Sequence, residues 1–206
     1  GNAIWNCGEA IYAVSDAIVR NNIVANSDIG ISSYPHVQVP AMKNLTIVHN
    51  SVYGHTECLK IRWSSAGGMT LANNAVYCPG TTALDASGLS RSKITVKSNY
   101  ISGKLSGGEI DGNRFVDGGN PPSAFSNPAE KDFWPSSGSA LKGKAVDTFG
   151  ATTDFNSAIR TAPYDIGAYE TDGQTSNPGW KVGPGFKGMA AMDTLPPASS
   201  TDIMAR

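Results

Sequence analysis

The chain has 206 residues, of which 40% are hydrophobic and 16% charged, enough apolar sequence to bury a core and to exclude disorder along its whole length. Lysine and arginine (16) nearly balance aspartate and glutamate (17), so no net field attracts phosphate backbones and we expect no nucleic-acid partner. No apolar run approaches the roughly 18 residues of a membrane-spanning helix, so we expect no membrane span.

From its first residues onward the sequence repeats itself. Short segments such as 47–53 each carry an asparagine at the same position between apolar residues, and the first residues match the second half of that pattern. The asparagines at the shared position are Asn2, Asn21, Asn50, Asn74, Asn99 and Asn113. A spacing of about 25 residues with variable insertions is typical of a solenoid of stacked coils.

Each repeat has the pattern of short strands. Apolar residues alternate, as at Leu45 and Ile47, and β-branched residues are frequent, which favours strands over helices. A second strand is expected eight or nine residues after the asparagine, at 10–12, 29–31, 59–61 and 82–84. Strands that stack about 4.8 Å apart in successive coils make an all-β parallel β-helix. The asparagines then form an internal ladder, because stacked amides bond each other and the backbone at a bend.

The end of this pattern is followed by a distinctive segment. It contains Ser137 to Asp147, then Asp154, Phe155 and Arg160, and finishes with the sequence Asp-Ile-Gly-Ala-Tyr-Glu at 165–170. Together with the asparagine-centred coils, it resembles the right-handed parallel β-helix proteins of the pectate-lyase-like superfamily, with the closing motif of choice-of-anchor Q domains. The resemblance implies a secreted or cell-surface protein acting on or near polysaccharide, and it identifies an architecture rather than a reaction.

The chain is accordingly divided into three parts: β-helix coils over residues 1–120, a closing segment over 121–170 and a C-terminal tail over 171–206. The coils start in mid-repeat, as expected of the C-terminal part of a longer β-helix. An open first coil would be covered by an upstream β-helix segment or by a second chain. The closing residues Asp154, Arg160, Asp165 and Glu170 are expected to form a polar network that caps the open core.

One column of aromatic residues is a candidate substrate platform. Three residues after each ladder asparagine the side chain is expected to point outward, and this column is Trp5, Val24, Tyr53, Tyr77, Ser102 and Val116. The rings either stack against sugar faces or stack on one another and cover the sheet.

The candidate catalytic residues lie in the second strand of one coil. Alternation places Lys60 and Arg62 on one face, beside His55 and with Trp63 as a further sugar-binding residue. β-Elimination from a uronate needs a cation to neutralise the carboxylate, a base for the C5 proton and an acid at the leaving oxygen. The resemblance implies such roles for Lys60 and Arg62, and the alternative is two solvated charges on an exposed strand.

Other chemistries have weaker support. A hydrolase needs clustered carboxylates, whereas Asp85, Glu109 and Asp111 fall in different coils. We expect no cofactor and no zinc site. Ca²⁺ is the alternative ligand, and it would bind if the turn acids Asp16, Asp28 and Glu57 converge on one pocket.

The three cysteines, Cys7, Cys58 and Cys78, are expected to be reduced and packed, or one of them to pair with an upstream partner. Cys58 and Cys78 have different offsets from the ladder asparagine and are not expected to stack.

Two functions follow from the sequence. The first is a secreted polysaccharide-interacting enzyme that acts as a uronate lyase. The alternative is a non-catalytic surface, matrix or adhesin-like protein that binds glycan or assembles through its open coil.

Overall fold

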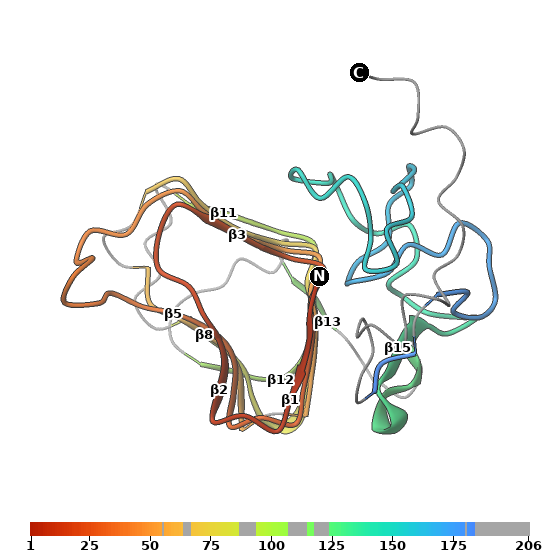
Figure 1. The fold of residues 1–206 in the computed structure, drawn as a ribbon, viewed down its shortest axis with the longest axis horizontal. Coiled ribbons are helices and arrows are strands. Elements are labelled where there is room, and N and C mark those ends of the chain that lie inside the picture. Colours follow the sequence, from red (N-terminus) through yellow and green to blue (C-terminus); the bar gives the residue numbers. More distant parts are fainter. Residues whose placement is uncertain are drawn as a thin grey trace.

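The computed structural model describes residues 1–54, 56–63, 67–86, 94–106, 124–179 and 181–183, and the backbone of 115–117. The described residues up to 117 wind into a stack of parallel coils, seen end-on in Figure 1, and those from 124 to 183 form a cap that lies beside the stack. All the pairings between strands of the coils are parallel, as predicted for a β-helix.

The first four coils each contribute a strand, or part of a strand, to each of three faces. The first face holds β1 (Ala3–Trp5), β4 (Ile23–Ala25), β7 (Ser51–Tyr53), the starts of β10 (Ala75–Asp85) and β12 (Asn99–Ser106), and β13 (Phe115–Asp117). The second holds β2 (Glu9–Tyr12), β5 (Ile29–Ser33), β8 (Glu57–Ile61) and the ends of β10 and β12. The third holds β3 (Ala17–Arg20), β6 (Leu45–Val48), β9 (Met69–Ala72) and β11 (Ile94–Lys97).

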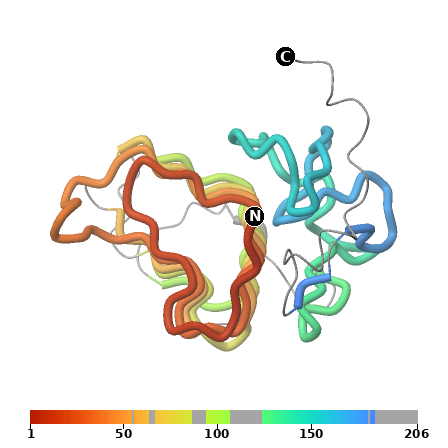
Figure 2. Tube along the Cα trace, viewed as in Figure 1, coloured from red at the N-terminus to blue at the C-terminus, as the bar shows by residue number. Residues whose placement is uncertain are grey.

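The coils are right-handed. In Figure 2 the first coil lies in front, and the chain passes clockwise from the first face through the second to the third as it recedes from the viewer. This is the hand that connections between parallel strands strongly favour, because the strands themselves twist to the right.

Alternating apolar side chains fill the inside of the stack. Ile31, Leu59 and Leu84 occupy equivalent positions in neighbouring coils and are fully buried. Burying one such side chain contributes about 1.5–3 kcal/mol. The coils cannot slip by one residue, because every apolar residue would then move to the outside.

An asparagine ladder runs along this core. The amide of Asn50 bonds those of Asn22 and Asn74, and Asn74 in turn bonds Asn99. The member in the second coil is therefore Asn22, and the prediction of Asn21 was wrong by one residue. Asn21 instead takes the left-handed backbone conformation, with φ of 55°. Asn113 lies outside the described residues.

The cap contains little regular structure. Strands β14 (Phe125–Asn127) and β15 (Asp132–Pro135) form a hairpin around the 3-10 helix η3 (Pro128–Glu130), and the rest of the cap is irregular. Its apolar residues Trp134, Phe155 and Ile166 pack with Ile23, Ala75 and Tyr100 of three different coils. The cap therefore covers the side of the stack, along the first face, and the expectation that it closes the end of the core was wrong.

A disulfide joins two adjacent coils. Cys58 on β8 and Cys78 on β10 are both fully buried and bonded, with their Cα atoms 6.3 Å apart, whereas Cys7 is free and exposed. The expectation of three reduced cysteines was wrong, because Cys58 and Cys78 form a disulfide. Different offsets from the ladder do not keep these cysteines apart, because Cys78 lies where β10 bends from the first face to the second.

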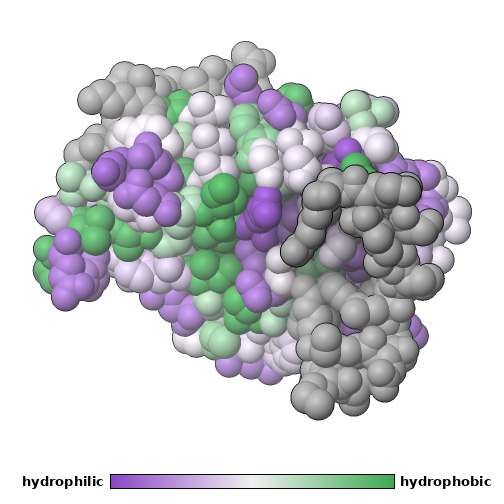
Figure 3. Space-filling model, turned by 45° about the horizontal axis from the view of Figure 1, so that its top comes forward, coloured by the Kyte–Doolittle hydropathy of each residue, from purple (hydrophilic) through white to green (hydrophobic). Residues whose placement is uncertain are grey.

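The visible surface is mixed in character. Figure 3 shows apolar residues gathered near the middle of the view, with hydrophilic residues around them. Among the described residues, no helix has the length and apolarity needed to cross a membrane.

Candidate functional site

The outer side of the second face carries a row of polar side chains. Pairing of β2, β5, β8 and β10 aligns Tyr12, Ser32, Lys60 and Asp85 across successive coils. Their neighbours one residue earlier, such as Leu59 and Leu84, point into the core. Strand alternation therefore turns the polar row outward.

Two tyrosines form an aromatic pair at one end of this row. The ring centroids of Tyr12 and Tyr34 are 4.6 Å apart, and the Tyr12 hydroxyl donates a hydrogen bond to the Tyr34 carbonyl oxygen at 3.0 Å. Tyr34 and Ser32 donate to the carboxylate of Glu9, at 3.4 and 2.5 Å. The ammonium group of Lys60 lies 5.8 Å from the Tyr34 ring centroid, within cation–π range.

Two carboxylates and two cationic side chains lie beside the tyrosines. Lys60 Nζ lies 3.5 Å from Glu57 Oε2, and Arg62 forms an ion pair with Asp85. These side chains keep 15–31% of their surface exposed. Burial, and then the negative charge of Asp85, raise the pKa of Glu57 against the opposing effect of Lys60. We call Glu57, Lys60, Arg62 and Asp85 the charged quartet.

The structure places the predicted catalytic residues as follows. Lys60 and Arg62 lie on one outer face, each paired with a carboxylate. Trp63 has no exposed surface, and its indole N–H donates to Ser33 Oγ at 2.8 Å. Its proposed contact with sugar was therefore wrong, because the alternation that turns Lys60 and Arg62 outward turns Trp63 inward. His55 lies outside the described residues.

The predicted aromatic platform lies on a different face. Trp5, Tyr53 and Tyr77 align on β1, β7 and β10, with Ala25 rather than Val24 between them. Tyr53 contacts Tyr77 of the next coil at a ring-centroid distance of 5.3 Å, and it contacts Phe133 of the cap at 5.6 Å. The ammonium group of Lys131, also in the cap, lies over the ring of Trp5. Tyr53 and Tyr77 therefore contact each other, and all three half-buried rings pack against the cap on a different face from the charged quartet.

Sequence reasoning missed the tyrosine pair and the ion pair of Arg62 with Asp85. Asp85 was set aside because it falls in another coil than Glu109 and Asp111, yet stacked coils bring equivalent positions together, as with Asp85 and Lys60. The signal that could have found the row is its spacing, which follows that of the ladder asparagines. Glu109 and Asp111 lie outside the described residues.

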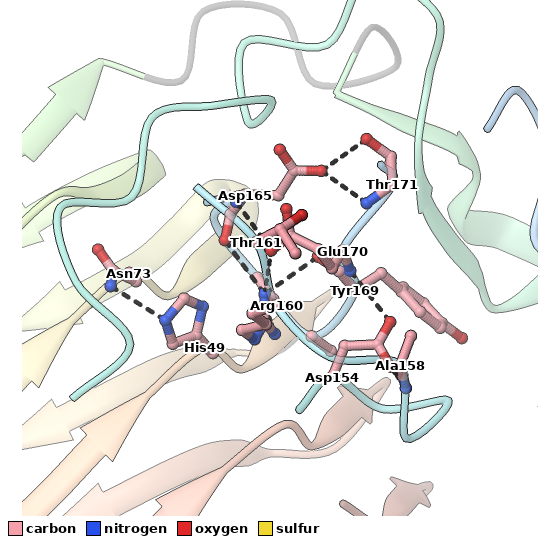
Figure 4. Close-up of polar contacts among 12 residues, drawn as sticks. His49, Asn73, Asp154, Ala158, Arg160, Thr161, Asp165, Tyr169, Glu170 and Thr171 are labelled. Carbon is pink, nitrogen blue, oxygen red and sulfur yellow. Dashed lines mark hydrogen bonds and ion pairs between the residues drawn. The ribbon is translucent and has the colours of Figure 1, made fainter. Parts of the chain in front are cut away.

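A second polar cluster joins the cap to the coils (Figure 4). Arg160 donates to Glu170 at 3.1 Å and to Asn21 Oδ1 at 3.1 Å, while His49 Nε2 lies 3.2 Å from the Asp147 carbonyl oxygen. The cluster also contains Asp154, which accepts from the Glu170 amide, and Asp165, which accepts from Thr171.

Burial dominates the electrostatics of this cluster. It lowers the pKa of His49 to about 3, with the nearby Arg160 acting in the same direction, and it raises the pKa of Glu170 to about 7. The ionisable side chains are 0–5% exposed and bonded to each other or to backbone. The cluster therefore serves attachment of the cap rather than contact with a substrate.

The charged quartet lies on the outer side of the second face, which extends over several coils. Two cavities of about 350 and 430 Å³ lie in the cap, lined by residues such as Lys131 and Asn177 in one and Lys142 and Thr161 in the other. An extended face across several coils suits a polymer, whereas small ligands favour enclosed cavities.

The turn acids do not converge on a cation site. Asp16 bonds Asn44 and lies near Lys43, and Glu57 bonds Lys60. Throughout the described part of the chain, no three histidine, cysteine, aspartate or glutamate side chains are grouped to hold a metal ion.

The comparisons with known proteins found no matching family model, no similar curated protein and no similar solved structure. The fold and the site geometry define the chain as a parallel β-helix protein with an internal asparagine ladder.

Proposed function

We propose that this protein is a secreted or cell-surface β-helix protein that binds polysaccharide along the outer side of its second face. The observation that carries the proposal is the Tyr12–Tyr34 pair, with ring centroids 4.6 Å apart, beside the charged quartet. Aromatic rings stack on the apolar faces of sugars, and adjacent charged groups bond their hydroxyl and carboxyl groups.

Two further observations support this function. The coils and the sequence at 165–170 resemble pectate-lyase-like β-helix proteins with a choice-of-anchor Q closing motif, which act on or near polysaccharide at the cell surface. The buried Cys58–Cys78 disulfide is typical of proteins that fold in an oxidising, extracytoplasmic compartment.

The reaction that the charged quartet supports best is β-elimination from a uronate. Lys60 and Arg62 would neutralise the sugar carboxylate, and a carboxylate of the quartet would take the C5 proton. The C4–C5 double bond would then form as the C4–O bond breaks, and the leaving oxygen would take up a proton from Lys60 or from water.

One observation favours a non-catalytic surface, matrix or adhesin-like protein instead. Each cation already has a carboxylate partner, Lys60 with Glu57 and Arg62 with Asp85. A lyase would have to release at least one of them when substrate binds, whereas a glycan-binding protein would not.

Binding and turnover can be measured on one panel of uronate and neutral polysaccharides. We expect Tyr34→Ala and Lys60→Ala to weaken binding by about tenfold each, which corresponds to about 1.4 kcal/mol, and Lys97→Ala on the third face to leave it unchanged. Ultraviolet absorbance of unsaturated sugar ends reports elimination. Binding without such product selects the non-catalytic function, and failure of every polymer to bind refutes the proposal.

A further inference from the structure

The cap contains a cavity that the second face does not explain. Its volume is about 350 Å³, at the lower end of the roughly 300–1,000 Å³ typical of small-molecule sites. Its walls are two segments far apart in the sequence, 127–132 in the hairpin and 177–182, which lie side by side in Figure 1. The described residues that line it are Asn127, Glu130, Lys131, Asp132, Asn177, Lys181 and Val182.

Hydrogen bonds within the cap hold both walls in place. Asn177 Oδ1 accepts from Asn156 Nδ2 and from the Gly179 amide, both at 2.9 Å. On the opposite wall, Asp132 Oδ1 accepts from the Trp134 amide at 3.1 Å. These side chains are therefore positioned before a ligand enters, which lowers the entropy cost of binding.

The charges of the lining balance. Glu130 and Asp132 supply two carboxylates, and Lys131 and Lys181 supply two ammonium groups. Three of the four are consecutive in the sequence, so positive and negative groups alternate along one wall and do not form two separate poles. Such a lining favours a neutral ligand, because an anion or a cation would meet a like charge next to its partner.

The lining groups also complement hydroxyl groups. Carboxylates only accept hydrogen bonds, ammonium groups only donate them, and the amide of Asn127 does both. Because a hydroxyl group both donates and accepts, adjacent hydroxyls of a sugar ring can bond a carboxylate and an ammonium group together. Val182, the apolar member of the lining, packs against the apolar cluster of the cap and offers contact to the C–H groups of such a ring.

Lys131 is fixed by its backbone and by the first coil. It takes the left-handed conformation, with φ of 60°, and its amide donates to the Pro128 carbonyl oxygen at 3.0 Å. Its ammonium group lies 5.6 Å from the centroid of the Trp5 ring, within cation–π range. The coils thus help to place a charged group of the cavity.

We propose that this cavity, which we call the cap site, binds a neutral sugar unit, a single ring or a disaccharide with adjacent hydroxyl groups. It is a second carbohydrate site, away from the second face, and it does not depend on the polysaccharide site proposed above. Asn127, Glu130 and Lys181 are exposed, so part of the lining is open to solvent and a ligand can enter.

Nuclear magnetic resonance titration of the full chain tests the cap site. The probes are glucose, galactose and mannose, with cyclohexanol as a ring that carries a single hydroxyl group. We expect at least one sugar to shift the side-chain amide signals of Asn127 and Asn177, and cyclohexanol to leave them unchanged. Galacturonate should bind no more tightly than galactose, because the charges of the lining balance.

Variants of exposed lining residues test the contacts. Glu130→Ala and Lys181→Ala should each weaken the affinity for the sugar about tenfold, since each removes a charged hydrogen-bonding group. Lys97→Ala, an exposed lysine on the third face, is the matched control and should leave the affinity unchanged.

Four results would refute the cap site: no shift with any of the three sugars, equal shifts with cyclohexanol, tighter binding of galacturonate than of galactose, or unchanged sugar affinity in both lining variants. Tyr34→Ala separates this site from the second face, because it should weaken polysaccharide binding and leave the sugar affinity of the cap site unchanged. Sugar binding at the cap site without polysaccharide binding refutes the proposed function alone, and the reverse refutes the cap site alone.

Discussion

The side chain of Asn50 connects three coils through one buried amide. Its Nδ2 lies 3.0 Å from the Val19 carbonyl oxygen and 2.9 Å from Asn74 Oδ1, and its Oδ1 accepts from Asn22 at 2.8 Å. Each bond satisfies a backbone or amide group that an apolar side chain would leave buried and unpaired. The ladder thus fixes how the coils lie on one another.

Replacing this amide should be costly. We expect Asn50→Ala to lower the free energy of unfolding by about 3 kcal/mol, since it strands several buried polar groups. Urea denaturation measures the change, and the exposed Asn127→Ala in the cap serves as the control with an effect below about 0.5 kcal/mol. Equal effects of the two substitutions would contradict a structural role for the ladder.

Single residues also show where sequence reasoning fails. Asn50, Asn74 and Asn99 could be identified from their apolar neighbours, but the doublet Asn21–Asn22 fits two alignments one residue apart. Only strand pairing, Val19 with Ile47 and Ile23 with Ser51, decides between them. The alternation that places Lys60 and Arg62 on one outer face also predicts that Trp63 points inward. Trp63 was nevertheless assigned to sugar binding, because aromatic side chains commonly contact sugars.

At the scale of elements, the Cys58–Cys78 disulfide reinforces the contact between β8 and β10. The bond closes a loop with a sequence separation of 20 residues, and in the chain-entropy account such a crosslink contributes about 3 kcal/mol. We expect the double variant Cys58→Ala with Cys78→Ala to lose about that much in thermal or urea unfolding, and Cys7→Ala to lose little.

A simpler measurement tests the pairing itself. Alkylation of the unfolded protein without reductant should add one group, at Cys7, and three after reduction. Modification of all three cysteines without reductant would contradict the bond.

The strands, and the residues of each strand that face the core, were predictable, because alternation and repeat length are local properties of the sequence. Which face stays exposed was not, since it depends on where the cap packs. The cap is irregular and has no repeat from which its position could be inferred. Trp5, Tyr53 and Tyr77 therefore appeared as a platform, although the cap covers their face, while Tyr34 lies outside any strand and gave no signal.

For the whole molecule, the attachment of the cap depends on buried polar contacts with successive coils. Asn21, His49 and Asn73 occupy equivalent turns with left-handed backbone, with φ of 55°, 53° and 55°. Their side chains reach Thr153 and Asp147 of the cap. Asn21 and Asn73 make these contacts through side-chain amides, whereas His49 makes its contact through an imidazole, which can be protonated.

Acid should therefore weaken the molecule through His49. Its pKa falls from 6.5 to about 3 on folding, mainly by burial. Between these two pKa values His49 is protonated in the unfolded chain but neutral in the folded protein. The stability that neutral His49 contributes is therefore fully present above about pH 6.5 and is lost as the pH falls toward 3. The loss is roughly 5 kcal/mol at most.

The substitution His49→Asn isolates this effect, because asparagine already occupies both neighbouring turns and tolerates their backbone conformation. We expect the variant to match the wild-type protein within about 1 kcal/mol near pH 7 and to lose less stability in acid. Glu170 acts in the opposite direction, since its raised pKa favours the folded state at low pH, but it is present in both proteins and cancels in their difference. Urea midpoints measured at several pH values give that difference, and parallel curves for the two proteins would show that His49 does not control cap attachment.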